Sequence, residues 1–381
     1  MSLLIKISII FVVLSSFLMG VTYAMNISES EIQNKWEELF ADIQKLNFFT
    51  STKMIRLKNV EVADLDLEGA IFNGAEFENI QWKNVTAEHS KYRKTKFKKC
   101  KFINCKFTFA EFTDVIFEKC EFINTTFLKS TVIKVVIINC KSVESEFDSL
   151  VGTELLVKES EFGVRSSFTD SKIPLCFQNT SLSGVNMMGM TGIQTLLIEG
   201  GSLDEVNFNK SHFSNVVLRQ VTQGEGPTRF NDVIAGTILF EDVNMTRGVS
   251  LAFVTAKTVG ISGGTFRVAT EGSRIAEFTA RDSILPLFDM SESQMAYVLL
   301  SNCQLRDIAL WDCFVDEYAV VNSAIHTIRG KNFKAETVLW DNVALNGKID
   351  LTNAQVKDFR PTRIQRGPDL QLITTGSNMK F

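Results

Sequence analysis

The sequence contains few of the residues on which most enzyme and metal sites depend. Among its 381 residues are 3 His, 4 Trp, 4 Tyr and 5 Pro, and its 7 Cys include no CxxC pair. It therefore offers no zinc motif and no recognisable grouping of a Ser or Cys nucleophile with a His. Phe, by contrast, occurs 31 times. A chain so rich in one aromatic residue and so poor in His favours a repetitive scaffold over an enzyme.

The charge balance excludes two further classes of protein. The formal net charge is −4, and 45% of the residues are hydrophobic. Intrinsically disordered chains combine few apolar residues with a large net charge, and general nucleic-acid binders are strongly basic. The sequence therefore predicts a folded chain that does not bind nucleic acid, and it indicates no cofactor and no metal.

Residues 1–24 have the pattern of a secretory signal peptide. A single lysine precedes the mainly apolar run 9–20, and Thr22–Ala24 is a small-residue cleavage site. This pattern predicts an exported protein, either periplasmic or secreted. The alternative is an uncleaved N-terminal membrane anchor, although a bilayer span needs about 20 apolar residues.

Two further segments flank the main body of the chain. Residues 25–50 show helical spacing after a capping-box start, which predicts a short helix that caps the following fold. The alternative for this helix is an amphipathic surface for a partner. Residues 360–381 contain two prolines and no periodicity, so they predict a loosely held polar tail. The apolar positions of the helix are Ile32, Trp36, Leu39, Phe40, Ile43 and Leu46.

A five-residue period runs without a slip over residues 70–149. The stretch divides into sixteen units such as AEFEN, CKFIN and CEFIN, and the first position of each unit is small or β-branched. Neither a helix, with a period of 3.6, nor a strand, with a period of 2, produces this pattern. The third position is aromatic in twelve of the sixteen units, at Phe72, Phe77, Trp82, Tyr92, Phe97, Phe102, Phe107, Phe112, Phe117, Phe122, Phe127 and Phe147.

A period of five with two inward positions indicates a chain that turns a corner after every unit. Four units would close a square coil, and successive coils would stack at about 4.8 Å through strand-like hydrogen bonds. The stretch resembles the pentapeptide-repeat family, whose signature is A-(D/N)-L-x-x with Phe often replacing Leu. The resemblance implies an all-β solenoid of the right-handed quadrilateral β-helix type.

The period continues with interruptions, so the predicted solenoid covers 51–359. Across 221–227 the phase shifts by two residues, which predicts a loop at one corner. The stretches 150–200 and 248–297 are irregular, and the sequence leaves open whether 248–297 keeps the coil. Further regular units occupy 201–220, 228–247 and 298–327.

Six of the seven cysteines occupy the small first position of a unit, which predicts that they are small buried side chains. Cys100, Cys120 and Cys140 are spaced by one predicted coil, so they are expected to stack in one column. A separation of about 4.8 Å lies within the Cα range of a disulfide, and export would favour oxidation. The sequence therefore leaves a disulfide in this column open.

The main surface feature is a basic belt at outward positions of nearly one whole coil. Acidic residues such as Glu121 follow one coil further along. One interpretation is ion pairing between stacked coils, for example between Lys101 and Glu121. The other is attraction of an anionic polymer or membrane surface. The belt consists of Lys91, Arg93, Lys94, Lys96, Lys98, Lys99, Lys101 and Lys106.

These observations together favour a non-catalytic scaffold or binding protein that contacts proteins or anionic polymers outside the cytoplasm. An uncapped C-terminal coil would also permit an end-to-end homodimer. One alternative is a carbohydrate-active β-helix enzyme, which would need a cleft with two close carboxylates. The other, implied by the resemblance, is a DNA mimic that binds topoisomerases. The signal peptide and the basic belt disfavour this last alternative.

Overall fold

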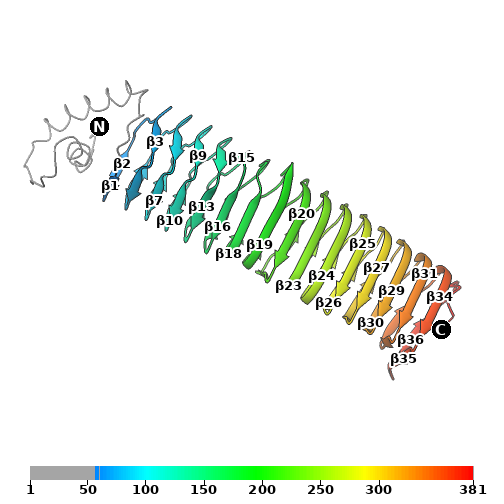
Figure 1. Cartoon of the computed structure of the whole chain (residues 1–381). Coiled ribbons are helices and arrows are strands. Elements are labelled where there is room, and N and C mark those ends of the chain that lie inside the picture. Colours follow the sequence, from blue (N-terminus) through cyan, green and yellow to red (C-terminus); the bar gives the residue numbers. More distant parts are fainter. Residues whose placement is uncertain (1–55, 60, 381) are drawn as a thin grey trace, which may run out of the picture. The chain divides into compact units, whose positions relative to one another are not determined.

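The computed structural model describes residues 56–59 and 61–380. The predicted signal peptide and capping helix lie outside these residues. The described chain forms two compact units, which meet in the sequence at Leu175 and Cys176. Each unit is a solenoid of parallel β-strands (Figure 1), which confirms the predicted all-β solenoid. Among the described residues there is no helix long and apolar enough to cross a membrane.

In the first unit, three columns of short parallel strands stack one coil above the next. The register joins residues 20 positions apart, as in Phe77, Phe97 and Phe117. Isolated bridges such as Thr86 to Lys106 form a fourth column. Column A contains β3 (Ile71–Asn73), β6 (Lys91–Arg93), β9 (Glu111–Thr113), β12 (Thr131–Ile133) and β15 (Val151–Gly152). Column B contains β1 (Arg56–Lys58), β4 (Glu76–Glu78), β7 (Lys96–Lys98), β10 (Ile116–Glu118), β13 (Val135–Ile138) and β16 (Leu155–Lys158). Column C contains β2 (Glu61–Ala63), β5 (Gln81–Lys83), β8 (Lys101–Ile103), β11 (Glu121–Ile123), β14 (Lys141–Val143) and β17 (Glu161–Phe162).

The corners depend on the fifth residue of each unit, which adopts a left-handed backbone conformation. At one corner Asp64, Asn84, Asn104 and Asn124 have φ between 47° and 55°. Asn and Asp tolerate this conformation better than other non-glycine residues. Their side chains also form a ladder, because each Asn Nδ2 donates to the side chain one coil earlier, at 2.8 to 3.1 Å. The sequence pattern AEFEN therefore encodes both the inward ring and the bend.

The core of the first unit consists of stacked rings, as the period predicts. Phe97 and Phe117 lie with ring centroids 4.9 Å apart and planes 6° apart. Between columns, Phe97 meets Phe102 edge-to-face at 5.5 Å. Parallel stacking of rings along a column and edge-to-face contact of rings between columns are both favourable geometries for aromatic side chains. Where the inward residue is Ser142 instead, its hydroxyl hydrogen-bonds to the hydroxyl of Ser166 at 3.1 Å.

In the second unit many strands are longer, because two consecutive five-residue units run on as one strand. In β25 and β27, for example, Ile275 pairs with Met295 and Ala280 with Leu300. The strands are β18 (Leu175–Ser183, which starts at the last residue of the first unit), β19 (Ile193–Asp204), β20 (His212–Arg219), β21 (Thr222–Gln223), β22 (Thr228–Arg229), β23 (Ile234–Ser250), β24 (Thr255–Ala269), β25 (Arg274–Arg281), β26 (Ile284–Asp289), β27 (Gln294–Ser301), β28 (Gln304–Ala309), β29 (Phe314–Val321), β30 (Ala324–Arg329), β31 (Lys334–Asp341), β32 (Ala344–Leu345), β33 (Lys348–Asp350), β34 (Gln355–Thr362), β35 (Gln365–Arg366) and β36 (Gln371–Ile373).

The stretch 248–297 keeps the stacked coil, although its sequence looks irregular. Its inward first positions include Ser273, Ser283 and Ser293, which are almost completely buried. Ser273 Oγ donates to the Leu251 carbonyl at 2.6 Å, so the buried hydroxyl is satisfied. Small hydroxyl residues thus replace the Cys and Val of the regular units.

Two other boundaries can be compared with the sequence. The predicted phase shift at 221–227 is present, because Leu203 pairs with Gln223, 20 positions on, whereas Asn207 bridges to Arg229, 22 positions on. Past residue 359 the coil continues, since β34, β35 and β36 pair with β31, β32 and β33. The residues up to Ile373 therefore belong to the solenoid, where the sequence predicted a polar tail from 360.

Candidate functional site

The basic belt lies on the outer surface of the first unit, and most of its charges have acidic partners. Lys91 Nζ lies 2.8 Å from Glu111, and Lys101 Nζ lies 2.9 Å from Glu121 one coil further along. Arg93 approaches Glu111 at 4.0 Å. Strand register brings these partners together, because residues 20 positions apart face each other in columns A and C. Ion pairing between stacked coils therefore occurs at the belt, as one of the two interpretations of the sequence expects.

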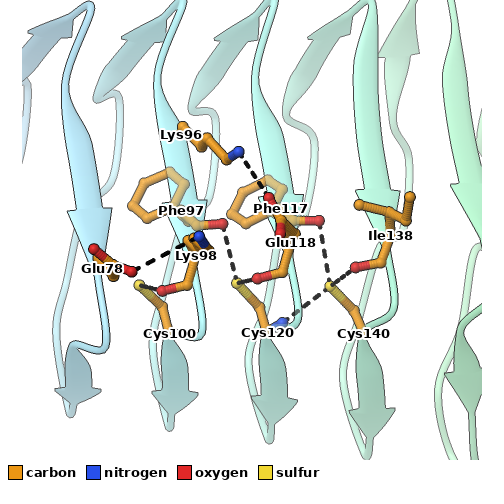
Figure 2. A network of polar contacts seen from close by, with 10 residues as sticks. All are labelled: Glu78, Lys96, Phe97, Lys98, Cys100, Phe117, Glu118, Cys120, Ile138 and Cys140. Carbon is orange, nitrogen blue, oxygen red and sulfur yellow. Dashed lines mark hydrogen bonds and ion pairs between the residues drawn. The ribbon is translucent and has the colours of Figure 1, made fainter.

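On column B the charges alternate along the strand stack (Figure 2). Glu78 lies between Lys58, at 2.5 Å, and Lys98, at 3.8 Å. The Lys96 ammonium forms an ion pair with the Glu118 carboxylate at 2.7 Å. The Lys58 ammonium lowers the pKa of Glu78, and the hydrogen bond from Lys96 lowers the pKa of Glu118. These exposed pairs fix the charge pattern of the surface more than they stabilise the fold.

Three belt lysines have no ion pair within the described part of the chain: Lys94, Lys99 and Lys106. Lys94 and Lys99 are corner residues with φ of 49° and 55°. A left-handed conformation costs a residue with a Cβ roughly 1–2 kcal/mol, and lysine also occupies the corners at Lys119, Lys129 and Lys134. The positive charge still available to a ligand is therefore concentrated at these three lysines.

The predicted cysteine column is present beside the belt (Figure 2). Cys100, Cys120 and Cys140 are buried, one coil apart. Their thiols donate to the carbonyls of Phe77, Phe97 and Phe117 at 3.3 to 3.4 Å. The Cys120 amide also donates to Cys140 Sγ at 3.2 Å. All seven cysteines, which lie within the described residues, are free thiols, and a disulfide in this column stays a prediction.

Burial makes several of these thiols poor nucleophiles. Desolvation raises the pKa of Cys105 to about 11 and raises the pKa values of Cys120 and Cys313. A thiol reacts as its thiolate. Cys105, Cys120 and Cys313 are therefore protonated near neutral pH and are suited to packing and hydrogen bonding. In the column itself, the hydrogen bond with Cys120 lowers the pKa of Cys100 and of Cys140.

The outward histidines belong to separate coils. His89 stacks on Phe109, with centroids 5.1 Å apart. Across the residues that the structure describes, no three His, Cys, Asp or Glu side chains gather in a way that could hold a metal ion. The loop 221–227 is tied down by Asp204, whose Oδ1 accepts from the Gly226 amide at 2.7 Å. That carboxylate therefore has a structural partner in the loop.

A further surface feature of the second unit was missed in the sequence. Beside the inward residues of one strand stack lies an outward column of aliphatic side chains, here called the apolar stripe. Its members sit between two buried residues, as in Val298–Leu300, so each strand reads as a continuous apolar run. A repeated apolar residue beside the third position was the available signal. The stripe contains Leu197, Val217 and Leu239 on three successive strands and Leu299 and Leu339 further along, and the same column has Gly260 and Thr279 between these two groups and Ala319 between Leu299 and Leu339.

Comparison with known proteins finds only distant similarity, to solved structures. No family model and no curated protein matches this chain. Among solved structures it is similar to trypsin-treated QnrB1, a plasmid-mediated fluoroquinolone resistance protein, with 17% identity over 45% of this chain and 84% of that one and a TM-score of 0.30. It is also similar to HetL, a pentapeptide-repeat protein involved in heterocyst differentiation regulation from the cyanobacterium Nostoc sp. strain PCC 7120, with 10% identity over 76% of this chain and 92% of that one and a TM-score of 0.22. A tailspike protein of E. coli bacteriophage HK620, in complex with a pentasaccharide, has 10% identity over 92% of this chain and 78% of that one and a TM-score of 0.24.

Proposed function

We propose that the protein is a non-catalytic β-solenoid scaffold that binds a partner protein through the apolar stripe of its second unit. Parallel sheets with near-continuous apolar strands are normally covered on both faces. Here the inner face is buried, as at Val298 and Leu300, while Leu299 between them is half-exposed on the outside. No element of the described residues is packed against this outer face. The apolar sequence of these strands is suited to a sheet that is covered on both faces. The uncovered outer face therefore supports binding of a partner protein there.

Charged side chains border the stripe and would set the register of a partner. Arg219 lies 2.7 Å from Glu241 and 3.4 Å from Glu199, next to Val217 and Leu239. An apolar centre with a charged rim is the usual composition of a protein interface.

A pair of matched variants tests this proposal. L239K/L299K introduces two charges into the stripe, whereas T255K/Q294K introduces two charges at exposed positions of β24 and β27 outside it. Quantitative affinity capture should show partners that bind the wild type and the control but are lost from L239K/L299K. An identical set of captured proteins for all three would contradict the proposal, provided the three share the same circular dichroism spectrum.

Binding of an anionic polymer or membrane surface by the basic belt is a separate part of the proposed function. The unpaired lysines Lys94, Lys99 and Lys106 support it, while the other belt charges are engaged by glutamates. Substitution of these three lysines by Gln should lower the salt concentration at which the protein elutes from a negatively charged matrix. Equal elution of this variant and the wild type would refute belt binding.

We also propose that the chain is exported, on the basis of the signal pattern in residues 1–24. N-terminal sequencing of the protein from an extracytoplasmic fraction should then begin at Met25. A protein found there with its first 24 residues intact would indicate the uncleaved anchor, and a protein confined to the cytoplasm would contradict export.

The last described strands support an end-to-end homodimer as a further proposal. β34 and β36 each pair with one preceding strand. Asn378 covers the other edge of β34 at Val356, through hydrogen bonds of 2.8 and 2.7 Å, so a second copy would pair with the remaining strand edges. Light scattering during gel filtration measures the mass directly. A monomer at all concentrations would contradict the dimer.

We propose the right-handed quadrilateral form for the coils, because four five-residue units fit each 20-residue step of the register. A crystal structure tests this form. A triangular or left-handed coil would contradict it.

A further inference from the structure

A shallow groove of about 800 Å³ runs along the outer face of the second unit. It crosses five stacked strands, β26, β28, β30, β32 and β35. At about 4.8 Å per strand, four steps give a length of about 19 Å. The groove belongs to neither the basic belt nor the apolar stripe.

The polar side chains along the groove are mainly hydrogen-bond donors and carry positive charge. None of the lining residues in the described part of the chain is Asp or Glu. Two arginines lie three strands apart, about 14 Å at this spacing, and neither Arg306 nor Arg366 has an acidic partner among the described residues. The polar lining consists of Gln304, Arg306, His326, Asn346, Gln365 and Arg366.

The acidic residue next to Arg306 in the chain is already paired. Asp307 follows Arg306 in the chain, and it accepts two hydrogen bonds from Arg329 at 3.1 and 2.9 Å. This bidentate pair leaves the Arg306 guanidinium free for a ligand. The local charge of the groove is thus positive, although the chain as a whole has a formal net charge of −4.

Two glycines keep the groove open beside its polar side chains. A Cβ on Gly347 would lie 2.8 Å from Cε1 of His326, and a Cβ on Gly367 would lie 2.8 Å from Oδ1 of Asn346. Larger residues would displace these two side chains. The adjoining corner also lengthens from coil to coil, because Ile325 and Ile328 are three positions apart, whereas their partners Leu345 and Ile349 are four apart.

We infer that this groove binds a linear acidic polysaccharide, with sugar carboxylates at Arg306 and Arg366 and sugar hydroxyls at the amides beside and between them. A guanidinium matches a carboxylate with two parallel hydrogen bonds. Gln304, Asn346 and Gln365 supply amide groups that both donate and accept, as hydroxyls do. Ala324 and Ala344 give a flat apolar floor for the C–H faces of the sugars.

Two other polyanions fit the groove less well. Single-stranded nucleic acid requires aromatic side chains for base stacking, and the only aromatic ring in the lining is His326. An acidic peptide brings one backbone amide donor per residue, but four of the five groove strands, β26, β28, β30 and β32, are paired on both sides, so their backbones offer few free acceptors. The groove also lacks the pair of carboxylates that glycoside hydrolysis requires, so the inferred activity is binding.

Calorimetry with tetragalacturonate provides the test, and its fully methyl-esterified form serves as the uncharged control. The wild type should bind the acid and not the ester. Because a hydrogen bond to a charged group contributes about one to two powers of ten in affinity, R306Q/R366Q should weaken binding at least tenfold. R274Q/R281Q removes the same charge from β25, outside the groove, and should bind like the wild type.

Several outcomes would overturn the inference. These are equal binding of acid and ester, unchanged affinity of R306Q/R366Q, and tighter binding of polyphosphate or polyglutamate than of the sugar. Hydrogen exchange of the wild type supplies a readout that needs no variant, since the bound sugar should slow exchange in residues 304–306 and 344–346. Protection confined to the first unit would place the ligand at the basic belt and refute the groove.

Discussion

Phe117 is the residue at which the stacked-ring core can be tested most directly. Its side chain is only 3% exposed. It stacks on Phe97 at 4.9 Å and meets Phe122 edge-to-face at 5.4 Å. F117A removes one ring from the middle of this array and leaves the rings above, below and beside it in place.

The expected cost is about 4–5 kcal/mol of unfolding free energy. Phe-to-Ala substitutions in cores cost about 3–5 kcal/mol, and the higher values occur where the cavity cannot collapse. Here backbone hydrogen bonds on both sides of β10 fix the coil spacing, so the neighbouring coils cannot close on the cavity. Phe109 provides a matched control, because it is 44% exposed at a corner. F109A loses contacts with the His89 ring and the Lys129 ammonium, together about 1 kcal/mol.

Urea unfolding followed by circular dichroism measures both variants. Because repeat proteins can unfold in parts, hydrogen exchange should accompany it, and F117A should accelerate exchange in residues 96–123. If F117A and F109A lose the same stability, or if F117A loses less than about 1 kcal/mol, the ring column does not hold the first unit together.

Three further predictions concern ionisable side chains. Among the described residues, the buried Tyr318 hydroxyl has no hydrogen-bond partner, so Y318F should raise the unfolding free energy by about 1 kcal/mol in urea titrations. Y92F removes a hydrogen bond to the neighbouring Ser90 and should lower the unfolding free energy. Since burial raises the pKa of Cys105 to about 11, iodoacetamide at pH 8 should label the partly exposed Cys176 well before Cys105, and equal rates by mass spectrometry would contradict its burial. The hydrogen bond from Lys96 lowers the pKa of Glu118 from its ordinary value of 4.5 in the fold, so the stabilising effect of the ionised carboxylate is present above pH 4.5 and is lost as the pH falls below it. When the pH is lowered, E118Q should therefore lose less stability than the wild type in thermal melts. Identical pH profiles of the two proteins would exclude this ion pair as a contributor to stability.

The sequence predicts the fold best where inward residues are large. In the regular units an aromatic third position next to small first positions identifies the coil, and all the later third positions in 298–327 are buried as predicted. In 248–297 the pattern is hidden because Ser273 and Ser283 occupy inward positions. Their burial depends on hydrogen bonds to backbone carbonyls, which a hydropathy pattern does not report.

The sites differ in how far the sequence predicts them. Lys101 and Glu121 pair as the 20-residue coil requires. Lys96 instead pairs diagonally with Glu118, two positions beyond Ile116, its direct partner on the adjacent strand of the same column. The groove could not be predicted. Its arginines are 60 positions apart, and its shape depends on Gly347 and Gly367, whose role is evident only when the side chains of the preceding coil are placed.

The order of charged side chains along the stacked coils decides whether they form ion pairs within the protein or remain available to bind an external ligand. On column B, Lys58, Glu78, Lys98 and Glu118 alternate in sign, so each charge is attracted to the coils on either side. Along the groove, Arg306 stands in one register column and Arg366 in the adjacent one, in register with Leu345, and neither column contains an acidic residue on the groove strands. No neighbouring coil can neutralise a column that contains only one sign of charge. An external anion is then its only counter-charge, and for this reason a ligand is expected at the groove before the more lysine-rich belt.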